Sequence, residues 1–209
     1  MRTRPLVALA VVGLVLGGCV SLKRTPEARF FVLRSVVEPA PPAPRTAALV
    51  GVLPVRLPGH LDRPQLVTWK APNELRIDEF LRWAEPLDVG LLRALTENLD
   101  ALLPDHRVVR SPWPTGVELR CRVAVGLRLF GLQDNGEVRL EGRWALLPAD
   151  HERPLDTGLA SLRRGPLATG PAGGDPGAGV EAMSELLGDL GRQIATAIRK
   201  LPADEAAKK

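Results

Sequence analysis

Apolar and polar residues alternate along the second half of the chain, as is typical of half-buried β-strands. The clearest alternation covers residues 117–129, and a second one covers 138–146. Asn135-Gly136 lies between them, a dipeptide that favours a two-residue type I′ turn. The spacing then predicts a hairpin in which Leu127 lies opposite Trp144. In this register both apolar faces lie on one side of the sheet, which favours it over a one-residue slip.

Shorter apolar runs predict the remaining strands. Residues 47–55 are almost all apolar, as in a central strand that is buried on both faces. Further strands are expected at 29–34, 107–110 and 158–164, and a second hairpin from 65–69 with 75–80.

Two segments have the apolar period of an α-helix. Leucine recurs every fourth residue from Leu87 to Leu103, after Pro86, which suits a first helical turn. A second amphipathic helix is expected over 180–201, after a Gly- and Pro-rich loop at 165–179. The elements together predict the α/β class: a single domain with a mixed, mostly antiparallel sheet packed with two amphipathic helices.

The first nineteen residues have the pattern of an export signal. A basic start is followed by an apolar run over 6–16, too short to span a bilayer, which needs about 20 residues. The run ends in Leu16, Gly17, Gly18 and Cys19, which resembles the lipobox of bacterial lipoproteins. The resemblance implies that the Cys19 sulfur carries diacylglycerol and that the mature chain begins there. The alternative is an ordinary signal peptide with an incidental cysteine.

The residues after the cysteine suggest a destination. Neither Val20 nor Ser21 is the aspartate that typically retains lipoproteins in the inner membrane. We therefore expect a lipid anchor in the outer membrane, with the domain on its periplasmic face. The expected organisation is a signal peptide at 1–18, a lipidated tether at 19–28, the folded domain at 29–202 and a polar tail at 203–209.

Composition limits the classes of partner. The full 209-residue chain has a net charge of +4, and two of its arginines, Arg2 and Arg4, leave with the signal. A mature chain near +2 with no long basic run does not indicate nucleic-acid binding.

The sequence carries no recognisable catalytic, cofactor or metal motif. Its three histidines, His60, His106 and His151, are scattered without metal-ligand spacing, and the latter two are expected in solvated loops. Cys121, the cysteine left unpaired, falls on the apolar side of a strand and is expected to be a core thiol rather than a nucleophile. We therefore expect neither an enzyme nor a cofactor.

Two polar motifs invite both structural and functional interpretations. The first comprises His60, Leu61, Asp62, Arg63, Pro64 and Gln65, and the second runs from Trp83 through Glu85 to Leu87. Structurally, the first is a loop pinned by an Asp62–Arg63 network, and Trp83 is a packing residue before a helix. Asp62 and Glu85 are expected in capping or ion pairs with Arg63 or Arg82 rather than as a catalytic pair. Functionally, the loop and the neighbouring turn form a contact surface for a partner.

Several stretches, taken together and in order, resemble the PqiC/YmbA family of ABC-type transport auxiliary lipoproteins. After the lipobox, Phe30-Phe-Val-Leu33 stands where that family has a Tyr-Tyr-x-Leu-like strand, and His60 stands for the tyrosine of a Tyr-Leu-Asp-Arg-Pro-Gln motif. The remaining matches are Trp83-Ala-Glu-Pro-Leu87, Leu140-Glu-Gly-Arg-Trp144, Ile194-Ala-x-x-Ile198 and Leu201-Pro202. The chain contains no tyrosine, so the phenol hydrogen bonds of the family motifs are lost.

The resemblance implies an accessory, non-catalytic role in lipid transport between membranes. The implied direct partner is a periplasmic MCE-domain protein, with inner-membrane transporter subunits engaged indirectly and a homo-oligomer compatible with the role. Two other classes stay open from the sequence. One is an outer-membrane lipoprotein that assists assembly of a β-barrel or lipopolysaccharide machine, and the other is a periplasmic hydrolase.

Overall fold

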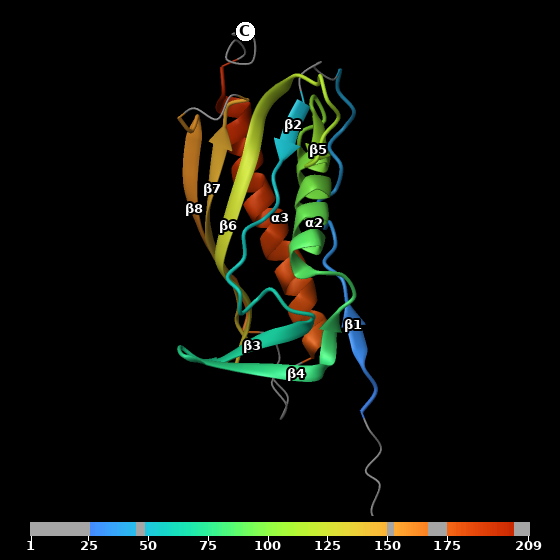
Figure 1. Ribbon diagram of the computed structural model, residues 1–209, viewed down its shortest axis with the longest axis vertical. Helices are drawn as coiled ribbons and strands as arrows, with labels where there is room; N and C mark the ends of the chain where they lie inside the picture. Colours follow the sequence, from blue (N-terminus) through green and yellow to red (C-terminus); the bar gives the residue numbers. More distant parts are fainter. Residues whose placement is uncertain (1–25, 45–48, 150–152, 167–174, 203–209) are drawn as a thin grey trace, which may run out of the picture.

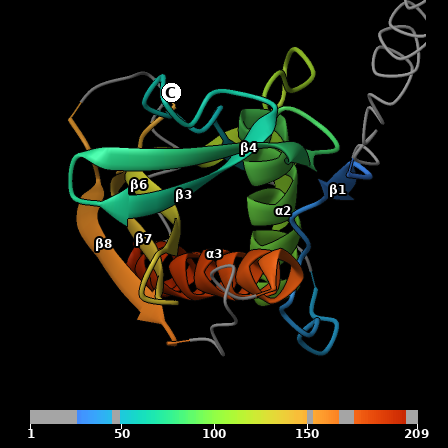
Figure 2. The ribbon, with the colours of Figure 1, turned by 90° about the horizontal axis from the view of Figure 1, so that it is seen from below.

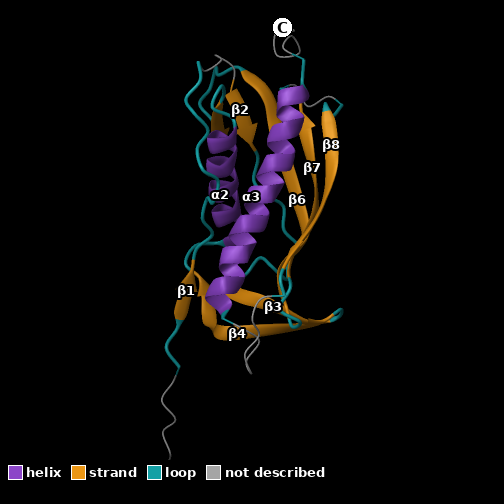
Figure 3. Cartoon of the chain, turned by 180° about the vertical axis from the view of Figure 1, so that it is seen from behind, coloured by secondary structure: helices purple, strands orange, loops and turns teal. Residues whose placement is uncertain are grey.

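Eight strands form one mixed sheet with two helices against it in the computed structural model, which describes residues 26–44, 49–149, 153–166 and 175–202. The tall strands β6, β7 and β8 have α3 across one face, with α2 beside α3, and the β3–β4 hairpin lies across one end (Figures 1 and 3). In chain order the elements are β1 (Arg29–Phe31), β2 (Leu49–Val52), β3 (Gln65–Ala71), β4 (Glu74–Trp83), α2 (Leu87–Leu102), β5 (Arg107–Arg110), β6 (Leu119–Gln133), β7 (Val138–Leu147), β8 (Asp156–Arg164) and α3 (Pro176–Lys200).

Pairing in the sheet confirms the mixed α/β domain and corrects the balance of strand directions. The pairs β1–β4, β2–β5, β2–β6 and β3–β6 are parallel, whereas β3–β4, β6–β7 and β7–β8 are antiparallel. The expectation that most pairings are antiparallel is therefore wrong. The reason is the length of β6, because β2 and β3 both pair along one of its edges and both run parallel to it.

The turn between β6 and β7 differs from the predicted one by its length. The main-chain N–H of Gly136 donates to the Gln133 carbonyl at 3.0 Å, and Gln133 N–H donates to the Glu137 carbonyl at 2.7 Å. Gly136 has a φ of 80°, which suits the left-handed residue of a three-residue loop. This loop, together with a bulge between Leu127 and Leu129, places Val125 opposite Trp144, so the predicted Leu127–Trp144 pair is wrong.

Helix α2 follows its predicted leucine stripe. Leu91, Leu95 and Leu99 are each 0% exposed, and Pro86 occupies the N-cap position. The apolar face packs toward the sheet and α3, as the period of the leucines requires.

Helix α3 begins one turn earlier than the apolar period indicates. The Asp175 carboxylate caps the helix by accepting a hydrogen bond from Gly177 N–H, and Pro176 is the first helical residue. Both are favoured helix-start residues, so the predicted loop at 165–179 ends at the cap. Later in α3, a Cβ at Gly191 would lie 3.4 Å from Cβ of Asn98, which shows how closely α2 and α3 approach.

Strand β2 is buried on both faces, as predicted. Val50 and Val52 are 0% exposed in the core. The opposite face is covered at Gly51, where an added Cβ would come within 2.9 Å of the Trp113 ring.

Among the described residues, no helix is long and apolar enough to cross a membrane.

The end of the molecule formed by β3 and β4 also holds β1. Seen from below, the β3–β4 hairpin lies over the ends of the long strands, and β1 lies at its α2 side (Figure 2). Strand β1 pairs with the last residues of β4, with Phe31 in register with Trp83. The described chain therefore enters the domain at this end.

Candidate functional site

The predicted loop at residues 60–65 is folded around one buried side chain. Leu61 is 2% exposed, and its N–H donates to the Pro58 carbonyl at 2.9 Å. Arg63 N–H donates in turn to the Leu61 carbonyl at 2.9 Å, while the Asp62 and Pro64 side chains are exposed. Within the described part of the chain no ion pair joins Asp62 to Arg63, so the expected network is absent and main-chain hydrogen bonds hold the loop.

At the start of this loop, His60 packs against the sheet. Its ring meets the Trp69 ring of β3 edge-on, with centroids 5.3 Å apart and planes 87° from parallel. Such T-shaped pairs are favourable because the positive edge of one ring faces the negative face of the other. The partly buried imidazole thus acts here as an aromatic body, a role that the absent tyrosine would also fill.

The second motif lies directly beside the first. Trp83 N–H donates to the Pro64 carbonyl at 2.7 Å, and Gln65 is in register with Arg82. The next residue, Ala84, donates to the Phe31 carbonyl of β1 at 2.9 Å. The loop, the turn and β1 therefore form one continuous region, which we call the hairpin-base region (residues 60–65 and 83–87, with β1).

Burial divides the predicted site residues into two groups. Trp83 and Leu87 are 7% and 4% exposed and, like Leu61, belong to the core. Asp62 and Pro64 are exposed, and the partly exposed residues of the site are His60, Arg63, Gln65 and Glu85. The first group positions the backbone, and the second forms the accessible surface.

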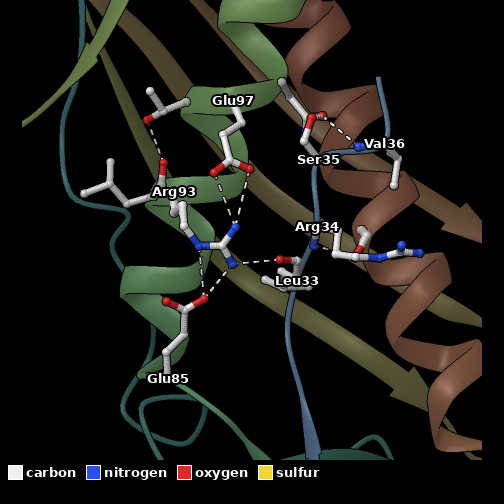
Figure 4. Close-up of polar contacts among 11 residues, drawn as sticks. Leu33, Arg34, Ser35, Val36, Glu85, Arg93 and Glu97 are labelled. Carbon is white, nitrogen blue, oxygen red and sulfur yellow. Dashed lines mark hydrogen bonds and ion pairs between the residues drawn. The ribbon is translucent and has the colours of Figure 1, made fainter. Parts of the chain in front are cut away.

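Glu85 pairs with Arg93 of α2 rather than with Arg82. Arg93 Nη2 and Nε donate to Glu85 Oε1 at 2.6 and 3.2 Å (Figure 4). Hydrogen bonding to Glu85 raises the pKa of the Arg93 guanidinium. Nη2 also donates to the Leu33 carbonyl at 2.8 Å, and the predicted helical pair with Glu97 forms at 3.4 Å. One arginine thus joins the hairpin-base region, α2 and the segment after β1.

The segment after β1, residues 32–44, forms a strap that is also bonded to two buried side chains. Asn98 of α2, 0% exposed, accepts through Oδ1 from the Ser35 hydroxyl at 2.9 Å and from Val36 N–H at 3.2 Å. Ser184 of α3, 2% exposed, accepts through its hydroxyl oxygen from Arg34 N–H at 3.2 Å. The first part of the strap, residues 33–36, therefore lies between the two helices and is bonded to both (Figure 4).

These strap contacts were not predicted from the sequence. Asn98 and Ser184 are polar residues within the apolar faces of their helices, and that interruption is the signal that could have identified them. Buried polar groups need partners, so each required a hydrogen bond from a neighbouring segment.

The remaining chemical candidates that the structure describes, Cys121 and His106, are both buried. Cys121 is 0% exposed, and burial raises the pKa of its thiol to about 11, which confirms the predicted core thiol. His106 is 4% exposed with Nδ1 3.0 Å from Asp105 Oδ1, so the expected solvated position is wrong. His151, Cys19 and the lipobox lie outside the described residues, and inside them no cluster of His, Cys, Asp or Glu is placed to hold a metal ion.

Comparison with known proteins assigns the family. The model of the ABC-type transport auxiliary lipoprotein component family matches residues 31–195, so the chain belongs to that family, in agreement with its resemblance to PqiC/YmbA proteins. It is thus a member of a lipoprotein family of auxiliary transport components rather than of a family of enzymes. No curated protein matches the sequence.

Solved structures share the fold at low sequence identity. The crystal structure of an uncharacterized protein is 21% identical with a TM-score of 0.64, covering 83% of this chain and 99% of that one. A protein from Xanthomonas campestris is 17% identical with a TM-score of 0.64, covering 80% of this chain and 93% of its own. Both likenesses concern the fold alone.

Proposed function

We propose that the chain is an outer-membrane-anchored accessory subunit of an MCE-type system that transports phospholipid between membranes, and that it docks the periplasmic MCE-domain protein at the outer membrane. The family supports the auxiliary role in transport. The observation that carries the docking role is the hairpin-base region, where the two polar motifs adjoin β1, the point at which the chain from the expected anchor enters the domain.

The accessible residues of this region are suited to a protein partner. Asp62 is exposed and Arg63 partly so, and neither has an ionic partner among the described residues. Unpaired charges at the rim of an interface contribute chiefly to association rate and orientation. The buried side chain of Leu61 keeps the loop conformation fixed, which limits the conformational entropy that the loop loses on binding.

A pull-down tests this role. The chain is incubated with the MCE-domain protein encoded at its own locus, and Asp62→Ala and Arg63→Ala are compared with the wild type. Glu118→Ala serves as the matched control, because Glu118 is an exposed acid before β6, outside the hairpin-base region. We expect capture by the wild type and control and reduced capture by both loop variants. Absence of wild-type capture would refute the docking role.

The anchor is tested separately by Cys19→Ser. We expect this variant to lose the thioether-linked lipid and to remain unprocessed or to be released into the periplasmic fraction. Fully processed Cys19→Ser protein that still fractionates with the outer membrane would contradict the lipoprotein anchor.

A further inference from the structure

A groove of about 1090 Å³ lies on the face of the sheet opposite α3. The strands place its residues by register, because partners in neighbouring strands point to the same face. Ala124 of β6 is in register with Ala145 of β7, and both line the groove. The segment at 53–56 lines one side, and Leu147 and Leu159 line the groove from β7 and β8.

One row of residues crosses the groove from side to side. Arg56 bridges to Gly126, Gly126 pairs with Arg143, and Arg143 pairs with Leu159. A Cβ added at Gly126 would meet a single atom within 4 Å, Cβ of Arg56 at 4.0 Å. The glycine therefore leaves open space between two arginines whose strands lie roughly 10 Å apart.

Both arginines of this row are exposed and lack an acidic partner in the described part of the chain. The contrast is with Arg139 of β7, which pairs with Glu141 at 2.6 Å. Two like charges flanking an uncovered glycine attract an anion, and the planar guanidinium binds phosphate or carboxylate oxygens in a bidentate manner.

Apart from Thr157, the other side chains that line the groove are apolar, and part of this apolar surface is exposed. Leu159 is 82% exposed, the largest exposure among the exposed apolar side chains of the described residues. With Leu53, Leu147 and the alanine pair it provides a surface that favours a hydrocarbon chain. A ligand that satisfies both halves of the groove therefore has an anionic head and an apolar tail.

We infer that this groove binds a phospholipid of net negative charge, with its phosphate between Arg56 and Arg143 and an acyl chain over Ala124 and Ala145. A peptide suits the groove less well, because β6 and β7 are paired along both edges and offer no free main-chain groups to an added strand. Among the described strands that line the groove, β8 pairs with β7 alone, but a strand added at its outer edge would not lie between Arg56 and Arg143. The choice of a phospholipid among anionic amphiphiles rests on the proposed function, whereas the charge and shape requirements do not.

The test uses the full chain carrying Cys19→Ser, titrated by calorimetry with 1-palmitoyl lysophosphatidic acid. Glycerol 3-phosphate supplies the head without the tail, and monopalmitoylglycerol supplies the tail without the charge. We expect both fragments to bind at least tenfold more weakly than the intact amphiphile. Equal binding of glycerol 3-phosphate would reduce the site to a simple anion site and overturn the inference.

Variants separate the contributions of charge and space. The double variant Arg56→Gln/Arg143→Gln should weaken binding at least tenfold, and Gly126→Leu should do so with both charges intact, because it fills the open space. Arg110→Gln on β5, an exposed arginine outside the groove, is the matched control and should stay within twofold. Unchanged binding by Gly126→Leu, with its unfolding curve intact, or an equal loss in the control, would overturn the inference.

The outcome is distinguishable from that of the docking test. Groove variants leave the hairpin-base region untouched, so they should capture the MCE-domain protein as the wild type does. Loss of lipid binding with normal capture separates the two sites. Normal lipid binding with no wild-type capture would support the groove and refute docking.

Discussion

Truncating Glu85 should destabilise the protein far more than truncating Glu97, although both carboxylates contact Arg93. Glu85 accepts two hydrogen bonds at 2.6 and 3.2 Å, and the two side chains are only 30% and 26% exposed. Charge-assisted hydrogen bonds in proteins are worth about 1.5–3 kcal/mol, and partial exposure places this pair in the lower half of that range. Glu97 lies at 3.4 Å and is 46% exposed, so its pair belongs with helical surface pairs of about 0.3–0.5 kcal/mol.

A double-mutant cycle measures each pair without the other effects of truncation. Glu85→Ala, Glu97→Ala and Arg93→Ala are combined pairwise, and the free energy of unfolding is obtained from urea titrations of the Cys19→Ser chain at neutral pH. We expect a coupling energy of about 1.5–2 kcal/mol between Glu85 and Arg93, and at most about 0.5 kcal/mol between Glu97 and Arg93. Equal coupling energies would refute the assignment of Glu85 as the principal partner of Arg93.

Four further substitutions test three other features. Cys121→Val should lower the free energy of unfolding in urea by roughly 1 kcal/mol. Because burial raises the pKa of the Cys121 thiol to about 11, this thiol in the native protein at pH 8 should react with a thiol reagent far more slowly than in the unfolded protein. Gly158→Ala should cost about 1–3 kcal/mol of stability, because the added Cβ would lie 2.3 Å from the Trp144 ring. Gly126→Ala, where the added Cβ meets only Arg56 Cβ at 4.0 Å, should be neutral or stabilising. A neutral Gly158→Ala would contradict the close packing of Trp144 on Gly158. Asp175→Ala should cost about 0.5–1 kcal/mol of stability at neutral pH, because it removes the cap of α3. Gly177 N–H and Arg29 lower the Asp175 pKa, so this cost should be complete above the ordinary carboxyl pKa of about 4 and should shrink as the pH falls through the lowered value. A cost that does not depend on pH would argue against the cap.

Local patterns predicted the elements of this fold well, since they depend on residues close in sequence. The leucine stripe of α2 and the alternation in β6 each predict one buried apolar face, and in each element that face is buried. The apolar period alone places the start of α3 one turn too late, whereas Asp175-Pro176 is a helix-start signal in its own right.

Long-range pairings were less accessible from the sequence. Nothing local to β2 or β3 specifies that both pair in parallel with the same edge of β6, because this depends on the path of the intervening chain. The same holds for the strap, whose hydrogen bonds join Ser35 to Asn98 and Arg34 to Ser184 across many residues. The neighbouring positions of the two site motifs follow from the β3–β4 hairpin, which the alternation did predict.

The strap also determines how the domain responds to a mechanical load. A pull on the chain before Arg29, directed along β1, is carried by the parallel hydrogen bonds to β4 in shear, so that they are stretched together rather than opened one by one. Beyond β1, the load passes through Arg93, Asn98 and Ser184 to both helices at once. Resistance to such a pull depends on the rate of unfolding rather than on equilibrium stability. A domain pulled at this end can therefore resist unfolding under load while its equilibrium stability stays ordinary.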